Sequence, residues 1–343
     1  MHRPRSTSGL AWLVLLLAFA MGLALPVAAS AEVNQVRISR GYGAHYLPFY
    51  IMEAQGLLQK HAAAAGLGDI KTEYFLVDGG NHINDAMLAG TIDIASTGTG
   101  GYLTLWAKAK GNPKLEVIGL GASASGGMIL TTRNPAIKTL RDFTEKDRIA
   151  VPGIKTSLGA ILLHMAVAKE FGDTEYAKLD PLTVGLAYPD AVAAMLSGQS
   201  EITAHMASAP FCYIELDHPG IHKVFNSIDV VGPVTTIMAF TTQQFAAANP
   251  KLTSAFVAAL KEATEFAANK KEDAAKIYLQ VAKVKMTHDE LMRVLNDPDL
   301  KFSLTPQGVM TYANFMNRVG MIKTKPQSWK DVFVGELSSL SGS

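Results

Sequence analysis

The chain has 343 residues, of which 31 are basic and 30 acidic, giving a formal net charge of +1. No basic block interrupts this balance, which disfavours a nucleic-acid partner, because neutralising phosphates needs a clustered positive surface. Cys212 is the single cysteine, so an internal disulfide is excluded and stability must come from burying apolar side chains.

The N-terminus has the layout of a secretory signal peptide. Positive charge at Arg3 and Arg5 precedes an apolar run over 10–25, and Ala29-Ser30-Ala31 supplies the small residues of a cleavage site. The run is shorter than the roughly 20 residues that a membrane-spanning helix needs, which disfavours an anchor. We therefore predict cleavage after Ala31 and export of a free protein to the periplasm.

The first part of the mature chain alternates between strand and helix patterns. The predicted strands are 36–39, 71–77, 92–96 and 117–120, and the first predicted helix is 47–59. Loops rich in glycine, tyrosine and hydroxyl residues follow three of the strands, at 40–46, 78–81 and 97–101. Strands that alternate with helices pair in parallel through right-handed crossovers, so the predicted fold class is α/β.

The second part of the chain repeats this order. A strand at 148–151, a loop at 152–157 and a helix at 158–169 follow one another. Farther on, 194–202 echoes 86–94, each with a helix that a glycine ends before a strand. The echo predicts two related lobes. Their loops are expected to face one cleft, because ligands bind outside the carboxyl ends of strands in such sheets.

Two extended crossings are predicted between the lobes. The stretch 121–127 consists of glycine, alanine and serine, and 232–236 is the candidate return crossing. The predicted domains are therefore a signal peptide at 1–31, a first lobe formed by 32–124 plus 235–343, and a second lobe formed by 125–234. Most of the chain after residue 240 is predicted to form helices that complete the first lobe.

The sequence contains none of several common catalytic motifs. The stretch 121–125 lacks the final glycine of a nucleophile elbow, and dinucleotide, nucleotide-phosphate and His-Glu-x-x-His motifs are absent. A lone cysteine also excludes a cysteine-based zinc site. We therefore predict binding without turnover, with no metal and no cofactor.

Two histidines are candidates for ligand binding. His45 lies in a predicted strand-to-helix loop between Tyr42 and Tyr46, and a solvent-exposed loop histidine is the alternative interpretation. His205 follows a strand in the echoed segment, at the position that matches Thr97. His164 lies on an apolar helix face and is interpreted as a core histidine.

Four stretches of the chain carry a family resemblance in a consistent order. They are 48–58 in the first helix, 87–95 across the first helix–glycine–strand unit, 149–157 at the start of the second lobe and 320–329 near the end. Together they span nearly the whole mature chain. In this order they resemble the nitrate/sulfonate/taurine-type periplasmic binding proteins of ABC transporters, which share a fold with the thiamine-pyrimidine precursor synthases.

The resemblance implies a type II periplasmic binding protein fold, with two lobes of parallel-rich sheets joined by two hinge strands. It also implies a small anionic or polar ligand of the sulfonate, taurine or nitrate class, an ABC transporter permease as partner, and a monomer. Alternatives are a pyrimidine or aromatic carboxylate ligand, or a sensor that presents its ligand to a membrane receptor.

An enzyme of the pyrimidine synthase type is disfavoured, because such enzymes use a cysteine-rich metal stretch. Arg40 and Arg133 are the nearest candidates for an oxyanion clamp. The residues that match the family's cleft positions are Tyr42, His45, Tyr46, Gly80, Asn81, Thr97, Gly98, Ser123, Thr156, Ser157 and His205.

Overall fold

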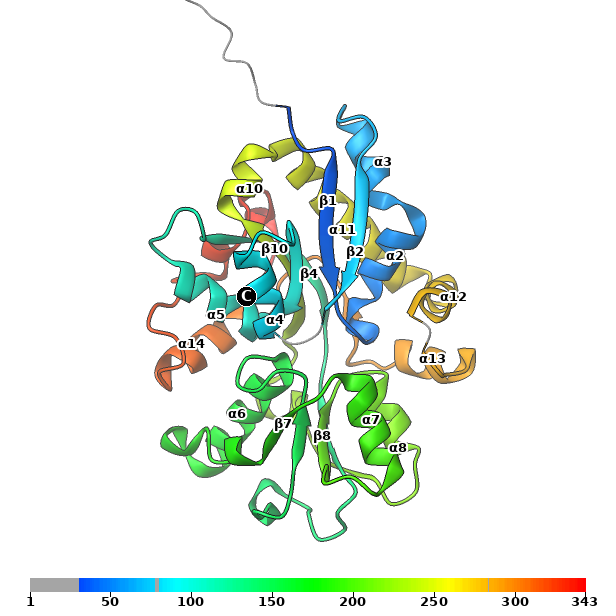
Figure 1. Cartoon of the computed structure of the whole chain (residues 1–343), viewed down its shortest axis with the longest axis vertical. Helices are drawn as coiled ribbons and strands as arrows, with labels where there is room; N and C mark the ends of the chain where they lie inside the picture. The colour runs from blue at the N-terminus through cyan, green and yellow to red at the C-terminus, as the bar shows by residue number, and fades with distance from the viewer. Residues whose placement is uncertain (1–30, 78–79, 283) are drawn as a thin grey trace, which may run out of the picture. The chain divides into compact units, whose positions relative to one another are not determined.

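The computed structural model describes residues 31–77, 80–282 and 284–343. Within them, Glu32–Ser343 forms a compact unit that contains two mixed sheets with helices packed around them (Figure 1). The predicted signal peptide lies outside the described residues, apart from Ala31. Along this described part of the chain, none of the helices combines the length and apolar character that crossing a membrane requires.

The six-stranded sheet and its helices form the first lobe, with the strand order β11-β4-β10-β3-β1-β2. β1 pairs in parallel with β2 and β3, as the alternation of strands and helices predicts. β10 instead runs antiparallel to β3 and β4, and β11 is antiparallel to β4, so the sheet is mixed and not parallel-rich as expected. The strands are β1 Gln35–Arg40, β2 Lys71–Leu76, β3 Ile94–Gly98, β4 Val117–Ser125, β10 Thr235–Thr242 and β11 Lys301–Phe302.

The helices of the first lobe pack in two groups, one around α11 and the other around α5. Gly56 ends α2 in a left-handed conformation with φ 59°, so the single helix predicted over 47–59 is two helices, α2 and α3. The helices are η1 Ala44–Tyr46, α2 Leu47–Gln55, α3 Leu57–Ala64, α4 Gly80–Leu88, α5 Thr99–Ala109, α10 Gln243–Ala248, α11 Pro250–Asn269, α12 Lys271–Ala282, α13 His288–Leu295, α14 Val309–Arg318, η5 Trp329–Val332 and η6 Gly335–Ser339.

The five-stranded sheet and its helices form the second lobe, with the order β7-β6-β8-β5-β9. β6 is parallel to β7 and β8, whereas β5 is antiparallel to β8 and β9. The strands are β5 Ile129–Thr132, β6 Ile149–Val151, β7 Thr183–Gly185, β8 Ala204–Ala207 and β9 His222–Asn226. The helices are η2 Leu140–Asp142, α6 Leu158–Phe171, η3 Asp173–Glu175, η4 Asp180–Leu182, α7 Tyr188–Ser197, α8 Phe211–Leu216 and α9 Ile228–Val231.

The chain crosses between the sheets after β4 and before β10. These strands are neighbours, with Thr235 opposite Ser125, and the Gly126 N–H donates to the Val234 carbonyl at 3.3 Å. The two crossings therefore leave the first sheet side by side, as two hinge strands must. β4 is longer than the predicted strand at 117–120 and includes much of the stretch predicted as a crossing.

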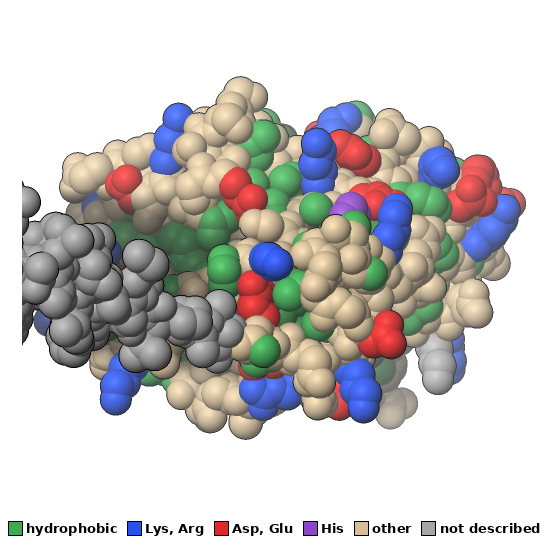
Figure 2. Space-filling view, turned by 90° about the horizontal axis from the view of Figure 1, so that it is seen from above, with side chains coloured by type: hydrophobic (Ala, Val, Ile, Leu, Met, Phe, Trp, Pro, Cys, Tyr) green, Lys and Arg blue, Asp and Glu red, His purple; other side chains and the backbone are tan. Residues whose placement is uncertain are grey.

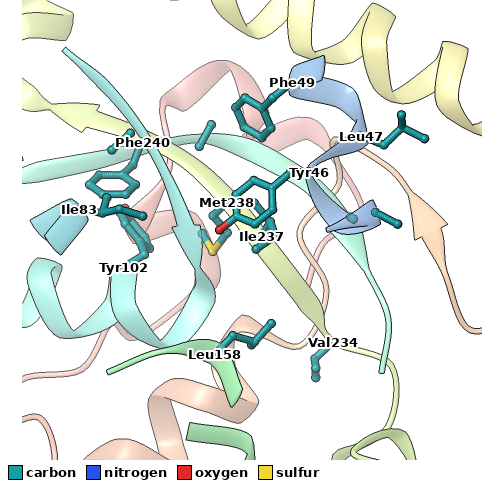
Figure 3. Close-up of a cluster of buried hydrophobic side chains, with 14 of the residues drawn as sticks. Tyr46, Leu47, Phe49, Ile83, Tyr102, Leu158, Val234, Ile237, Met238 and Phe240 are labelled. Atoms are coloured by element: carbon teal, nitrogen blue, oxygen red, sulfur yellow. The ribbon is translucent and has the colours of Figure 1, made fainter. Parts of the chain in front are cut away.

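Apolar side chains from both lobes form a continuous core. In Figure 3, Tyr46, Ile237 and Met238 of the first lobe lie in the same buried cluster as Leu158 of the second. Phe240 of β10 packs against Tyr102 of α5, with ring centroids 5.1 Å apart. Cys212 is also buried, in agreement with its interpretation as a small hydrophobic residue.

The surface carries both signs of charge in close mixture. On the face of the molecule in Figure 2, Lys and Arg side chains are interspersed with Asp and Glu. This mixture matches the near-balance of 31 basic and 30 acidic residues in the sequence. The visible part of that face therefore shows no clustered positive charge of the kind that nucleic-acid binding needs.

Candidate functional site

A narrow cavity lies between the lobes, at the carboxyl ends of β1, β3, β6, β7 and β8. It encloses about 380 Å³ of space not filled by atoms, which includes open solvent, but only about 20 Å³ is wide enough for water. A cavity must offer about 10–15 Å³ of such space to hold one water molecule, so this one has room for very little. The lining residues are Tyr42, His45, Tyr46, Thr97, Gly98, Pro152, Ser157, Leu158, Tyr188, Ser208 and Ile237.

The loop after β1 supplies Tyr42, His45 and Tyr46 to the cavity. Gly41 makes this possible, because a Cβ there would lie only 2.6 Å from the Tyr46 ring. Gly43 has φ 103° and faces the Ala209 carbonyl at a distance where a Cβ would clash. Small residues thus let the loop lie against both its own tyrosine and the second lobe.

His45 is almost fully buried where the cavity meets the hinge. Its burial lowers its pKa from 6.5 to about 4, so the imidazole is neutral at pH 7. Nε2 faces Gly126, where a Cβ would stand 2.8 Å away. Ser123 is also buried, and its hydroxyl donates to the His45 carbonyl at 3.2 Å. Ser123 therefore holds the loop from beneath and is not among the lining residues.

Acidification is expected to destabilise the fold through His45. The unfolded state takes up a proton below pH 6.5, whereas the folded state does so only near pH 4, so unfolding becomes more favourable as the pH falls between these values. The His45 contribution reaches about 3 kcal/mol below pH 4. Urea unfolding of wild type and His45→Gln at pH 7.5, 5.5 and 4.5 measures it. A wild-type-minus-variant difference that does not change with pH would contradict the buried neutral imidazole.

Two helices begin at the cavity from opposite lobes. α5 follows Gly98, and α6 follows Ser157, whose side chain accepts a hydrogen bond from the Ala160 N–H at 3.2 Å. The first N–H groups of a helix have no partner within it, and the helix dipole favours negative charge there. The two helix starts give the cavity donors for an anionic or strongly polar group.

Direct contacts between the lobes border the cavity. The Ala44 N–H donates to the Ala209 carbonyl at 2.8 Å, joining the main chains of the two lobes. Gly98 lies so close to Leu158 that a Cβ would be 2.7 Å from the Leu158 Cβ. Beside a second, neighbouring pocket, the Tyr213 hydroxyl donates to Asp297. The described lobes are therefore closed on one another.

Further contacts tie the lobes together away from the cavity. Arg318 of α14 pairs with Asp173 of η3 at 2.6 Å, and Arg293 of α13 pairs with Asp217 after α8. All four side chains are about half exposed, so each pair adds little stability and is weakened by salt.

The wall contributed by the second lobe includes Tyr188, the first residue of α7. Its ring stacks on Phe211 with an interplanar angle of 3° and centroids 5.2 Å apart. His205 lies 5.6 Å from the same ring and is fully buried. His205 is not among the residues lining the cavity; its Nδ1 bonds to Glu215 at 2.6 Å.

The structure brings six of the predicted site residues to one cavity: Tyr42, His45, Tyr46, Thr97, Gly98 and Ser157. Ser123 and His205 lie behind its walls, and Thr156 is half-buried beside it. Gly80 and Asn81 begin α4, but their side chains are outside the described set. Ligand contact by any of these residues stays a prediction.

Five lining residues were not predicted: Pro152, Leu158, Tyr188, Ser208 and Ile237. Pro152 and Leu158 belong to or adjoin the loop predicted at 152–157, and Ser208 directly follows β8, so position after a strand was the available signal. Ile237 belongs to β10, whose first two residues alone were predicted, as the end of the crossing at 232–236. Tyr188 follows a strand of only three residues, Thr183–Gly185, whose pattern is too short to recognise.

The two candidate clamp arginines are engaged elsewhere. Arg40 pairs with Glu53 at 2.8 Å and lies over the Tyr50 ring. Arg133 donates to the carbonyls of Gly198, Ser200 and Ile202. His164 pairs with Asp180 in the core, as its interpretation as a core histidine requires.

The described lining of the cavity is uncharged but polar. It contains tyrosine, serine and threonine hydroxyls and the neutral His45, and none of its residues is Asp, Glu, Lys or Arg. The part of the chain that the structure describes also holds no group of three or more His, Cys, Asp or Glu placed to bind a metal ion. Such a lining can bind a polar group through hydrogen bonds and a planar group through its rings.

Solved structures similar to this chain are binding proteins at low sequence identity. The alkanesulfonate-binding protein SsuA from Xanthomonas axonopodis pv. citri, bound to MOPS, has a TM-score of 0.66 and 19% identity, covering 85% of this chain and 96% of that chain. The nitrate-binding protein NrtA from Synechocystis PCC 6803 has a TM-score of 0.67 and 15% identity, covering 90% and 88%.

A third similar structure is the Candida albicans CA3427 gene product, described as having the generic periplasmic binding protein fold. Its TM-score is 0.65 at 13% identity, covering 89% of this chain and 95% of that chain. These likenesses confirm the predicted fold. No curated protein matches the sequence significantly. A family model described as the NMT1-like family matches residues 29–282. The chain therefore belongs to the NMT1-like family, and the family resemblance of its sequence is confirmed.

Proposed function

We propose that this chain is the solute-binding component of an ABC importer, exported to the periplasm with its signal peptide cleaved after Ala31. One observation carries the proposal: loops at the carboxyl ends of strands from both lobes line a single polar cavity. A ligand that touches both walls stabilises the closed form, and a permease can recognise that form. The moving units in this proposal are 32–124 with 235–343, and 125–234. The similarity of the chain to an alkanesulfonate-binding protein and a nitrate-binding protein supports a binding function.

The lining favours a small organic anion that carries a planar ring. Tyr42, Tyr46 and Tyr188 offer ring faces and edges, and the starts of α5 and α6 offer N–H donors to a carboxylate or sulfonate. Among the described lining residues there is no carboxylate to balance the ammonium group of taurine. Nitrate would leave the rings unused. The similar SsuA structure holds MOPS, a sulfonate whose ring is saturated and not planar, so it supports the anionic group and not the preference for a planar ring.

Ring-bearing ligands require the lobes to separate and close again. Only about 20 Å³ of the cavity is wide enough for water, whereas ligand pockets typically enclose about 300–1,000 Å³. Entry of a ring must therefore move the lobes apart or turn the tyrosine rings. If the tyrosine rings turn to make room for the ligand, closure over it restores contacts such as that between Gly98 and Leu158.

Aromatic anions are expected to raise the melting temperature of the mature protein. We propose a panel of benzoate, benzenesulfonate, MOPS, methanesulfonate, taurine, nitrate and uncharged thymine, measured by thermal shift and calorimetry. At 100 times its Kd, a ligand stabilises the folded state by about 2.7 kcal/mol, which raises Tm by several degrees. Benzoate and benzenesulfonate should give the largest shifts, and taurine and nitrate none.

Two results of this screen would contradict the proposal. Selective stabilisation by nitrate or taurine would mean that the rings do not select the ligand, although a binding function would stand. Conversion of a panel compound, with no cofactor added, would show turnover and overturn the binding function itself.

A further inference from the structure

A buried polar group lies behind the Tyr188 wall of the cavity. It consists of His205 on β8, Glu215 on α8 and Thr131 on β5. Glu215 accepts a hydrogen bond from the Thr131 hydroxyl at 2.6 Å, and its other oxygen is 2.6 Å from Nδ1 of His205. All three side chains have no exposed surface. The Thr131 hydroxyl thus holds the Glu215 carboxylate in place, and the carboxylate in turn fixes the orientation of the His205 ring.

The far side of the His205 ring has no such contact. Its Nε2 is buried and has no hydrogen-bond partner among the described residues. A buried polar atom left in this way reduces stability, and an apolar pair of similar size would pack there without that penalty. The core residue His164 also has a ring nitrogen, Nδ1, that is unpaired within the described part of the chain, so the role of His205 follows from what its ring contacts.

The feature that His205 contacts is the ring of Tyr188. The two ring centroids are 5.6 Å apart at an interplanar angle of 46°, while Phe211 stacks on the same tyrosine at 3°. Tyr188 is nearly buried, yet it lines the ligand cavity. Phe211 and His205 thus both contact the Tyr188 ring, and Glu215 holds His205 in place.

We infer that His205 is a positioning residue, which sets the angle of the Tyr188 ring for a planar ligand and does not contact the ligand itself. Glu215 and Thr131 hold His205 in that role. The inference rests on the proposed function, because it assigns one wall of the same cavity. The sequence predicts that His205 binds the ligand directly. In this inference His205 instead acts on the ligand through Tyr188.

The first test needs no ligand. The mature protein is labelled with 3-fluorotyrosine, and the fluorine signal of Tyr188 is assigned by its loss in Tyr188→Phe. His205→Asn keeps an amide donor near the place of Nδ1, facing Glu215, but removes the ring edge next to Tyr188. We expect the Tyr188 signal to shift or broaden in this variant. An unchanged signal would overturn the positioning role.

His164→Gln is the matched control. His164 is also buried in the second lobe, pairs with a carboxylate (Asp180, 2.5 Å) and contacts a tyrosine ring (Tyr176, 5.2 Å). Tyr176 does not line the cavity. Glutamine retains an amide at the place of Nε2, so the Tyr188 signal should stay where it is in wild type. If His205→Asn fails to fold, Glu215→Gln takes its place, since it keeps the shape of the group and removes its charge.

The second test is a double-mutant cycle with benzoate as the probe. If His205 acts through Tyr188, His205→Asn weakens benzoate binding about tenfold in wild type but less than about twofold in a Tyr188→Ala background. Equal losses in both backgrounds would mean direct contact and overturn the inference. If wild type does not bind benzoate, the ligand class proposed above fails, and the fluorine signal alone decides the role of His205.

Discussion

Gly98→Ala is expected to hold the two lobes apart and to weaken binding of any ligand that closes them. Gly98 has φ −60° and ψ 143°, a conformation that alanine adopts without strain. Its new methyl group would lie 2.7 Å from the Leu158 Cβ and 3.1 Å from the Leu158 N. Both atoms are fixed to the start of α6, so no side-chain rotation relieves the clash.

The expected size of this effect follows from the cost of overpacking. Such a clash destabilises the closed form by roughly 2 kcal/mol, which corresponds to about 30-fold weaker binding. The methyl group also reduces the space in the cavity, which should weaken ligand binding further. Calorimetry with benzoate and benzenesulfonate measures the affinity, and small-angle scattering of the free protein should show a larger radius of gyration.

Gly335→Ala is the control for Gly98→Ala. A Cβ at Gly335 meets no atom within 4 Å, so affinity and radius should equal those of wild type. Gly100→Ala should be milder than Gly98→Ala, because its Cβ meets the side chain of Ile161, part of which can rotate away. A wild-type radius and affinity in Gly98→Ala would mean that the closed contact does not form in solution.

Phe240→Ala is expected to cause the largest loss of stability, about 3–5 kcal/mol in the free energy of unfolding. Phe240 is fully buried in β10, and its ring packs on Tyr102 in the cluster of Figure 3. Truncation leaves a cavity that rigid neighbours on two strands cannot fill. Since domains are stable by only about 5–15 kcal/mol, the fraction lost is large. Urea unfolding monitored by circular dichroism measures it.

Phe75→Ala provides the comparison for Phe240→Ala. Phe75 lies on the edge strand β2 and is 40% exposed, so its truncation should cost less than about 1 kcal/mol. Equal losses in the two variants would contradict the assignment of Phe240 to the main core.

Local patterns predicted the existence of most strands, but not how far each extends. The strand predicted at 92–96 is Ile94–Gly98, because Thr97 and Gly98 pair with β10. Likewise β4 continues to Ser125 between β10 and β11. These partners are more than 100 residues away in sequence. Their pairing extends the strands beyond what local propensity indicates, and a local sequence pattern cannot reveal it.

For the candidate site, the sequence located loops better than side chains. The rule that ligands bind at the carboxyl ends of strands selected the loops that hold Tyr46 and Ser157. It did not show which side chains within or near those loops face inward. His205 illustrates this, because successive side chains in a strand point to opposite faces, and its partner Glu215 lies on a separate helix. Tyr188 was missed since the strand before it is so short.

The hydrogen bond from Ala44 to Ala209 joins the lobes through main-chain atoms alone. Every residue except proline carries the required N–H, and every residue carries the carbonyl. Side chains around the ligand can thus be substituted one at a time without removing this hydrogen bond. Redesign of the cleft for other small molecules can therefore keep the Ala44–Ala209 contact as a fixed part of the closed form and vary only the side chains that surround it.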